Sequence, residues 1–211
     1  MTVAFCDNPK NHFDHLIDLL LSIPPQYTPR GQEITAELHE GIHTLPGGAE
    51  SFARVLLVRL QNWWRMFERI HLQALGHPSI QTSALGTELG PGKSSRLVHG
   101  THASLILNDS FVGSTTAVYD AIVIIAHTIL LSCSMPSSRI QYHQTELMNH
   151  AESILTIGKC QQGRYPYRGD ALRTGFPLRV VSAFGLTSRE RKAAEAILEK
   201  WGSITGPNLW S

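Results

Sequence analysis

Two ionisable residues, Asp120 and His127, stand inside a long apolar run that covers residues 117–131. They are seven residues apart, so a helix that turns by about 100° per residue places both on one face. Ionisable groups in apolar surroundings tend to have shifted pKa values and to gather at functional sites. The pair therefore predicts an acid or hydrogen-bond donor in a pocket. The structural alternative is a buried polar pair satisfied by backbone or by neighbouring helices.

Histidine and aromatic side chains elsewhere in the chain could complete a site around this pair. His99 and His102 are three residues apart and can share one face of a helix, with surface positions as the alternative. We group His102 with Asp120 and His127 as catalytic candidates, because each can donate or accept a proton. The candidate substrate-binding residues are rings and imidazoles that could line an apolar cavity: Trp63, Trp64, Tyr119, His99, Tyr142 and His143.

Two consecutive tryptophans, Trp63 and Trp64, point to different sides of the helix predicted around them. One indole is therefore expected in the core, and the other on a pocket wall or a partner surface. Tyr119 stands next to the aspartate of the apolar run and can donate through its hydroxyl, although an ordinary core tyrosine fits the same position. Tyr142 and His143 begin the next predicted helix, from which His143 could face the central one.

Sequence signals for a metal or a nucleotide are weak. His39 and His43 are four residues apart and could chelate a metal, but no third ligand is near them in the sequence. Residues 86–95 contain Gly-Lys-Ser, yet they lack the glycine spacing and the preceding apolar strand of a phosphate-binding loop, so a flexible surface loop is the better interpretation. We therefore expect no metal and no cofactor.

Composition excludes several broad classes of protein. A formal net charge of +1, with scattered lysines and arginines, lacks the basic stripe of a nucleic-acid-binding protein. Cys6, Cys133 and Cys160 are far apart and form no Cys-x-x-Cys motif, which disfavours disulfides and structural zinc and favours a reducing compartment. The N-terminus lacks the basic and apolar regions of a signal peptide. An intracellular protein, cytoplasmic or nuclear, is expected.

The apolar run is expected to be the central helix of a soluble domain. It is shorter than the roughly 20 apolar residues that a bilayer requires, and it contains Asp120. With 211 residues the chain can bury about 70% of the surface that it would expose when unfolded, which is enough for one stable domain. No membrane association is therefore predicted.

Helical periodicity dominates the rest of the chain and predicts an all-α fold, a single helical domain over residues 1–211 built around the apolar run. Residues 1–47 are expected to be less regular, and residues 80–96, with several Gly, Ser and Thr, are expected to form a long loop. Residues 97–107 fit either a helix or a strand. Helices are predicted at about 11–23, 49–75, 114–131, 138–157 and 187–201.

The order of features near the C-terminus resembles a known family. The apolar helix and the next amphipathic helix are followed by Gly-Phe-Pro-Leu-Arg-Val-Val-Ser-Ala-Phe at 175–184, and then by a charged helix at 187–202 that opens with a capping box, Thr187 to Glu190. This resembles the C-terminal part of the regulatory domain of fungal zinc-cluster transcription factors, in which a Phe/Trp-Pro-Leu segment precedes a charged helix. The resemblance covers roughly the second half of the chain and implies an all-helical fold and a fungal source.

The chain departs from that family in lacking its DNA-binding module. That module needs six closely spaced cysteines to hold two zinc ions, whereas this chain has three cysteines in all, none with ligand spacing. DNA binding in the family's manner is therefore not expected. The Met start predicts a complete chain, in which the regulatory fold stands alone.

Two functions remain open for such a domain. Broad apolar faces with a few donors are typical of a small-molecule site, and without cofactor chemistry such a pocket can catalyse cyclisation, isomerisation or cycloaddition of a polyene or terpenoid. A cofactor-free cyclase or isomerase of fungal secondary metabolism, of the Diels–Alderase type, is the leading hypothesis. The alternative is a non-catalytic regulatory or ligand-sensing protein that binds a partner. An interleaved homodimer is also allowed by the long loop and the proline-rich N-terminal third.

Overall fold

The computed structural model describes five segments, and in all of them the chain is mostly helical. No strand occurs within these segments, so the predicted all-α fold is confirmed. The described segments are residues 10–27, 47–72, 103–133, 137–162 and 168–205. The predicted loop at 80–96, His39, His43, His99 and His102 lie outside them.

The five predicted helices are present with differences at their ends, whereas the helix at residues 168–184 was not predicted. The ambiguous stretch at 97–107 is helical where it is described, and the long N-terminal helix changes after Phe67 into a π-helical turn. The elements are α1 (His12–Leu21), the 3₁₀ turn η1 (Pro25–Tyr27), α3 (Ala49–Phe67), the π turn η2 (Glu68–Leu72), α4 (Ala103–Asn108), α5 (Ser110–Leu131), α6 (Ser137–Gln162), α7 (Arg168–Phe184) and α8 (Ser188–Thr205).

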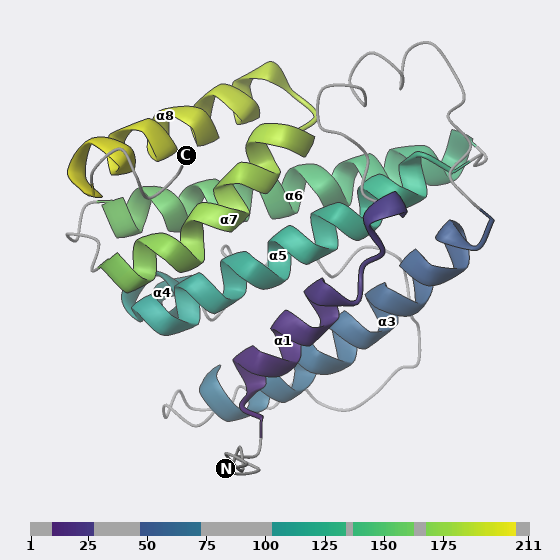
Figure 1. Ribbon diagram of the computed structural model, residues 1–211, viewed down its shortest axis with the longest axis horizontal. Helices are drawn as coiled ribbons and strands as arrows, with labels where there is room; N and C mark the ends of the chain where they lie inside the picture. The colour runs from purple at the N-terminus through teal and green to yellow at the C-terminus, as the bar shows by residue number, and fades with distance from the viewer. Residues whose placement is uncertain (1–9, 28–46, 73–102, 134–136, 163–167, 206–211) are drawn as a thin grey trace, which may run out of the picture.

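Helix α5 is the centre of the fold. Every residue from Val112 to Leu131 is buried, and the side chain of Asp109 caps the N-terminus by accepting a hydrogen bond from the Val112 amide at 2.9 Å. Figure 1 shows α5 crossing the middle of the bundle, between α6 and α7 on one side and α1 and α3 on the other. A helix that is apolar around its whole circumference needs such cover on all sides.

Helix α5 is longer than the apolar run at residues 117–131, which is by itself too short to span a membrane. The helix has 22 residues, so by length and composition alone it could cross a membrane. The most apolar 18-residue stretch of α5 is entirely buried inside the bundle, as it would be in the core helix of a soluble protein. The low proportion of charge along α5 therefore matches a position inside the bundle.

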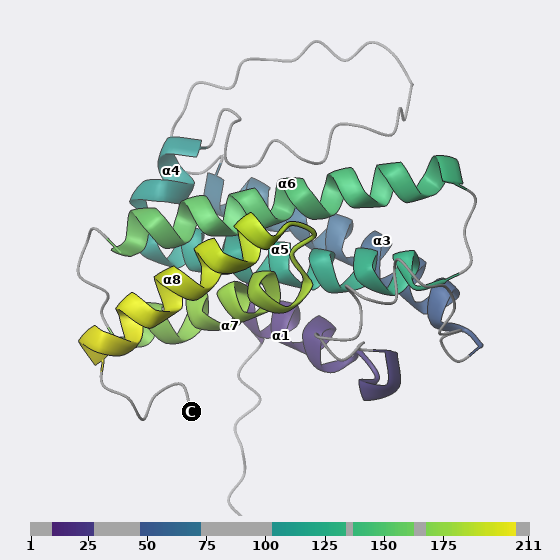
Figure 2. The ribbon, with the colours of Figure 1, turned by 90° about the horizontal axis from the view of Figure 1, so that it is seen from above.

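The second half of the bundle is built on close contacts between α6, α7 and α8. Figure 2 shows the long α6 lying along α5, with α7 and α8 beside them. A side chain on Gly158 of α6 would meet Leu178 of α7 at 3.3 Å and Ile197 of α8 at 3.6 Å, so the missing Cβ lets three helices approach one another. The predicted capping box is confirmed at the start of α8, where Glu190 and Thr187 each bond the other's backbone amide, at 2.9 and 3.1 Å.

Candidate functional site

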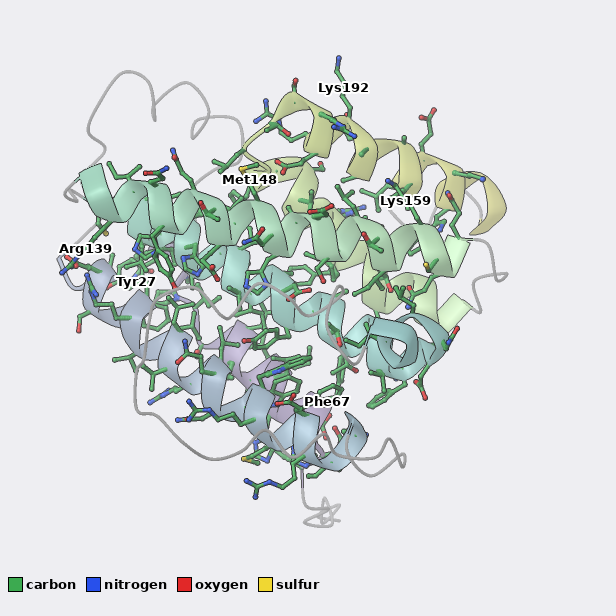
Figure 3. All side chains as sticks on the ribbon, turned by 180° about the vertical axis from the view of Figure 1, so that it is seen from behind. Tyr27, Phe67, Arg139, Met148, Lys159 and Lys192 are labelled. Carbon is green, nitrogen blue, oxygen red and sulfur yellow. The ribbon has the colours of Figure 1, made fainter. Side chains whose placement is uncertain are left out.

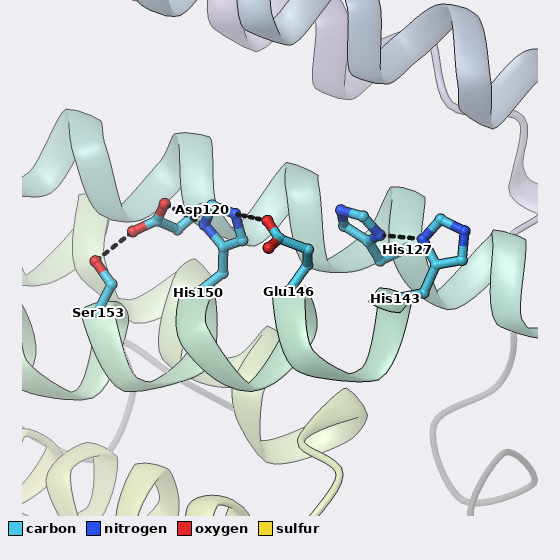
Figure 4. A network of polar contacts seen from close by, with 6 residues as sticks. All are labelled: Asp120, His127, His143, Glu146, His150 and Ser153. Carbon is cyan, nitrogen blue, oxygen red and sulfur yellow. Dashed lines mark hydrogen bonds and ion pairs between the residues drawn. The ribbon is translucent and has the colours of Figure 1, made fainter. Parts of the chain in front are cut away.

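A chain of polar side chains is buried where α5 packs against α6 (Figure 4). The carboxylate of Asp120, on α5, contacts two residues of α6: its Oδ1 lies 2.7 Å from Nδ1 of His150, and its Oδ2 accepts a hydrogen bond from Oγ of Ser153 at 2.6 Å. Asp120 is 0% exposed and His150 is 2% exposed. Both carboxylate oxygens are therefore satisfied by groups that have been removed from water together with them.

The contact with Asp120 fixes the orientation of the His150 ring. An ionised carboxylate can only accept hydrogen bonds, so Nδ1 of His150 carries the proton and donates it to Asp120. The opposite nitrogen, Nε2, then presents a lone pair when the ring is neutral. This atom is buried, and among the described residues it has no hydrogen-bond partner. In that tautomer Nε2 is held in one position and can accept a hydrogen bond from a further group.

Glu146 lies one helical turn before His150 on α6, and its carboxyl group approaches that nitrogen. Its Oε2 is 3.9 Å from Nε2 of His150, which is too long for a hydrogen bond. Burial raises the pKa of the Glu146 carboxyl, although the neighbouring His150 acts in the opposite direction. A ligand hydroxyl that came within reach of both atoms could donate to Nε2 and accept from a protonated Glu146.

Tyr119 connects this network to a cluster of aromatic rings on α3. Its ring is stacked on that of Trp63 at 5.8 Å, lies 4.9 Å from that of Trp64, and approaches His150 edge-on at 6.3 Å. Burial, with the nearby carboxylates of Asp120 and Glu146, raises the pKa of the Tyr119 hydroxyl. Tyr119 therefore keeps its proton and is at once a core residue and a neighbour of the polar network.

The two tryptophans differ in burial, as their positions predicted. Trp63 is 5% exposed, and its Nε1 donates a hydrogen bond to the carbonyl oxygen of His12 at 2.8 Å, which ties α3 to α1. Trp64 is only partly buried and packs beside Tyr119 and Phe67. The core position is thus confirmed for one indole, and the other lies at the edge of the aromatic cluster.

His127 does not pair with Asp120, although both face α6. Its Nδ1 lies 2.8 Å from Nδ1 of His143, so one ring donates and the other accepts, which requires the accepting ring to be neutral. Burial lowers the pKa of His127 to about 3, with further lowering by His150 and His143. Burial also lowers the pKa of His143, as do Arg54 and Arg139. The prediction that His143 faces the central helix is confirmed.

This histidine pair makes stability depend on pH. The folded pKa of His127, about 3, lies below its ordinary value of 6.5, so below pH 6.5 the unfolded chain takes up a proton that the folded chain does not. We expect the free energy of unfolding to fall between pH 6.5 and pH 3 by up to about 1.4 kcal/mol per pH unit for this one group. His143 acts in the same direction. Glu146 opposes both, because its raised pKa favours the fold at low pH.

The measurement is urea unfolding between pH 7 and pH 4, followed by circular dichroism. The double variant His127→Asn, His143→Asn, which cannot titrate, should show a flatter pH profile than the natural chain. His15→Asn, at an exposed position on α1, is the control and should keep the natural slope. Equal slopes in all three proteins would contradict the assignment.

The polar network includes three residues that the sequence analysis missed: Glu146, His150 and Ser153. They are four and three residues apart, so they fall on one face of α6, and this spacing was a signal that could have found them. Tyr142 lies at the end of the network beside His127 and His143 and is 37% exposed. Within the described residues, no group of three His, Cys, Asp or Glu side chains is placed to hold a metal ion.

Comparisons of the chain with protein-family models, with curated proteins and with solved structures found no match. The assignment of this site therefore depends on its geometry alone.

Proposed function

We propose that the chain is a small-molecule-binding helical protein that acts as a cofactor-independent cyclase or isomerase on an unsaturated, hydrophobic substrate. The observation that carries the proposal is the free Nε2 of His150. Its ring is oriented by Asp120, which is itself held by Ser153. A buried basic nitrogen without a partner is costly in a folded protein, and a ligand that donates to it would remove that cost. Residues 175–202 lie in the part of the chain that resembles the regulatory domain of fungal zinc-cluster transcription factors. This resemblance suggests that the protein acts inside a fungal cell, in secondary metabolism.

The Asp120–His150 pair has the arrangement that positions an imidazole as a general base. In an isomerisation, Nε2 would take a proton from a carbon next to a substrate carbonyl and return it to another carbon, which moves a double bond without any net gain or loss of atoms. Glu146, whose raised pKa favours the protonated form, could donate a hydrogen bond to the carbonyl oxygen on which negative charge develops. In a cyclisation, holding a flexible polyene in one folded conformer would lower the entropic barrier.

A non-catalytic ligand sensor is the second candidate, and the depth of the network favours it. Asp120, His150 and Glu146 are each 3% exposed or less, so a ligand bound there would become part of the core. Binding of that kind stabilises the folded state by mass action and can bias a regulatory domain between two conformations. The resemblance to transcription-factor regulatory domains is in line with this alternative.

The binding test observes the histidine ring nitrogens directly, by ¹⁵N-resolved NMR of the labelled protein. The probes are linear conjugated polyenes that carry a ketone or an ester. We expect at least one probe to shift the Nε2 resonance of His150 while the nitrogens of His127 and His143 stay in place. Those two histidines are the internal control, because they are buried between the same two helices but are already paired. An Nε2 that is hydrogen-bonded in the free protein and unmoved by every probe would overturn the proposal.

The catalytic test uses the probe that binds. It compares the rate of product formation in the presence of the protein with the rate in buffer alone. We expect His150→Gln to lower the rate by about 10²–10⁴, the usual contribution of a general base. His15→Gln, at an exposed position on α1, should leave the rate near that of the natural protein. Binding without any rate above the buffer control would exclude the enzyme and leave the ligand sensor.

A further inference from the structure

Helix α3 has an exposed apolar stripe along one flank, in addition to the stripe that it buries. The inner side contacts α5 and includes Leu56, Leu60 and Trp63. At about 100° per residue, Val55, Val58 and Met66 fall outside the buried side and Ile70 falls at its border, so these four large apolar residues of α3 and η2 form a stripe along one flank of the helix. They are exposed: Val55 by 48%, Val58 by 56%, Met66 by 49% and Ile70 by 45%. Figure 3 shows α3 at the edge of the bundle, with side chains projecting away from it.

Arginines flank this outer stripe. Arg59, Arg65 and Arg69 are all exposed, and none of them has an ion-pair partner among the described residues. Arg54 differs, because it forms an ion pair with Glu50 at 2.6 Å on the same helix. The outer face, defined by these three arginines and the four apolar residues, therefore combines apolar surface with positive charges that no described residue pairs.

We propose that the outer face of α3 binds an acidic amphipathic helix of a partner protein. The apolar stripe is long enough for a helix of comparable length, since Val55 to Met66 spans about 17 Å at 1.5 Å per residue. Leucine-like side chains of the partner would cover the four exposed residues, and carboxylates on both edges would pair with the arginines. A second copy of this chain fits less well, because a twofold interface would bring arginines against arginines. The proposal concerns a surface separate from the α5–α6 network and is independent of the proposed function.

The test titrates the full chain against a fluorescein-labelled helical 20-mer made of Leu, Ala and Glu, followed by fluorescence anisotropy. Saturable binding that weakens as salt is raised is expected. The same peptide with Lys in place of every Glu should not bind. The triple variant Arg59→Glu, Arg65→Glu, Arg69→Glu should bind about tenfold more weakly or worse, because three attractive pairs become repulsive.

The matched control is the triple variant Lys159→Glu, Arg189→Glu, Lys192→Glu, which makes the same change of charge at exposed positions on α6 and α8. It should bind the acidic peptide nearly as tightly as the natural chain. Equal weakening in the two triple variants, or no binding of the acidic peptide, would overturn the proposal. Binding to phosphatidylserine vesicles but not to the peptide would overturn it as well, because the occupant would then be a membrane surface. A further variant, Val58→Ser with Met66→Ser, should weaken binding even at high salt.

Discussion

Replacing Asp120 with alanine is expected to lower the free energy of unfolding by about 3–5 kcal/mol. The carboxylate accepts hydrogen bonds from His150 at 2.7 Å and from Ser153 at 2.6 Å, and both donors lose their acceptor in the variant while remaining buried. Water cannot replace that acceptor without opening the contact between α5 and α6. The quantity is measured by urea unfolding at pH 7, with helical circular dichroism as the signal.

Two further variants distinguish the destabilisation caused by losing the buried carboxylate from the effect of losing any carboxylate. Asp120→Asn keeps the shape and one acceptor oxygen, so we expect about 1–3 kcal/mol of destabilisation. Asp18→Ala removes an exposed carboxylate that pairs with Lys10 at 2.7 Å, and this loss should not exceed about 1 kcal/mol. If Asp120→Ala cost no more than Asp18→Ala, the carboxylate would not be buried as described.

Replacing Trp63 with alanine is expected to cost about 3–5 kcal/mol of stability, and replacing its neighbour Trp64 clearly less, about 1–2 kcal/mol. Trp63 is 5% exposed, is stacked between Phe67 and Tyr119, and bonds the carbonyl of His12 through its Nε1. Trp64 contacts some of the same rings but keeps part of its surface in water. Unfolding free energies of the two single variants give the comparison directly.

The variant Trp63→Phe separates the contribution of ring stacking to stability from that of the hydrogen bond. Phenylalanine retains most of the stacking with Phe67 and Tyr119 but loses the hydrogen bond to the His12 carbonyl, which is worth about 1 kcal/mol. This bond joins α1 to α3 across 51 residues of sequence, so its loss should also speed hydrogen exchange in α1. Equal destabilisation by Trp63→Ala and Trp64→Ala would contradict the burial described for the two rings.

The fold could be predicted well from the sequence where the signals are local. The apolar run marks α5 because eleven of the fifteen residues at 117–131 are aliphatic, and a helix that is apolar on most of its circumference is buried in the core. The capping box at Thr187 and Glu190 marks the start of α8. It can be recognised in the sequence because the whole motif lies within four neighbouring residues. The break after Phe67 was missed, because the apolar periodicity continues through η2.

The site could be predicted only in part, because its partners come from two helices. The sequence predicted that Asp120 and His127 share a face, and both do contact α6. It could not show which residues of α6 they meet, because that depends on how far α6 is shifted along α5, and this is set by packing over the whole length of the helices. His150 was therefore missed although it is the residue on which the proposed chemistry depends.

The order in which the helices follow one another has a consequence for how the chain is made. Helix α5 precedes α6 and α7, the two helices with which it shares its largest contacts. During synthesis from the N-terminus, α5 therefore leaves the ribosome before most of its cover exists. During that interval the nascent chain exposes a hydrophobic segment of 22 residues. Chaperones bind segments of this kind, and the membrane-insertion machinery selects them. We therefore expect the downstream helices to cover this segment only once they have been synthesised.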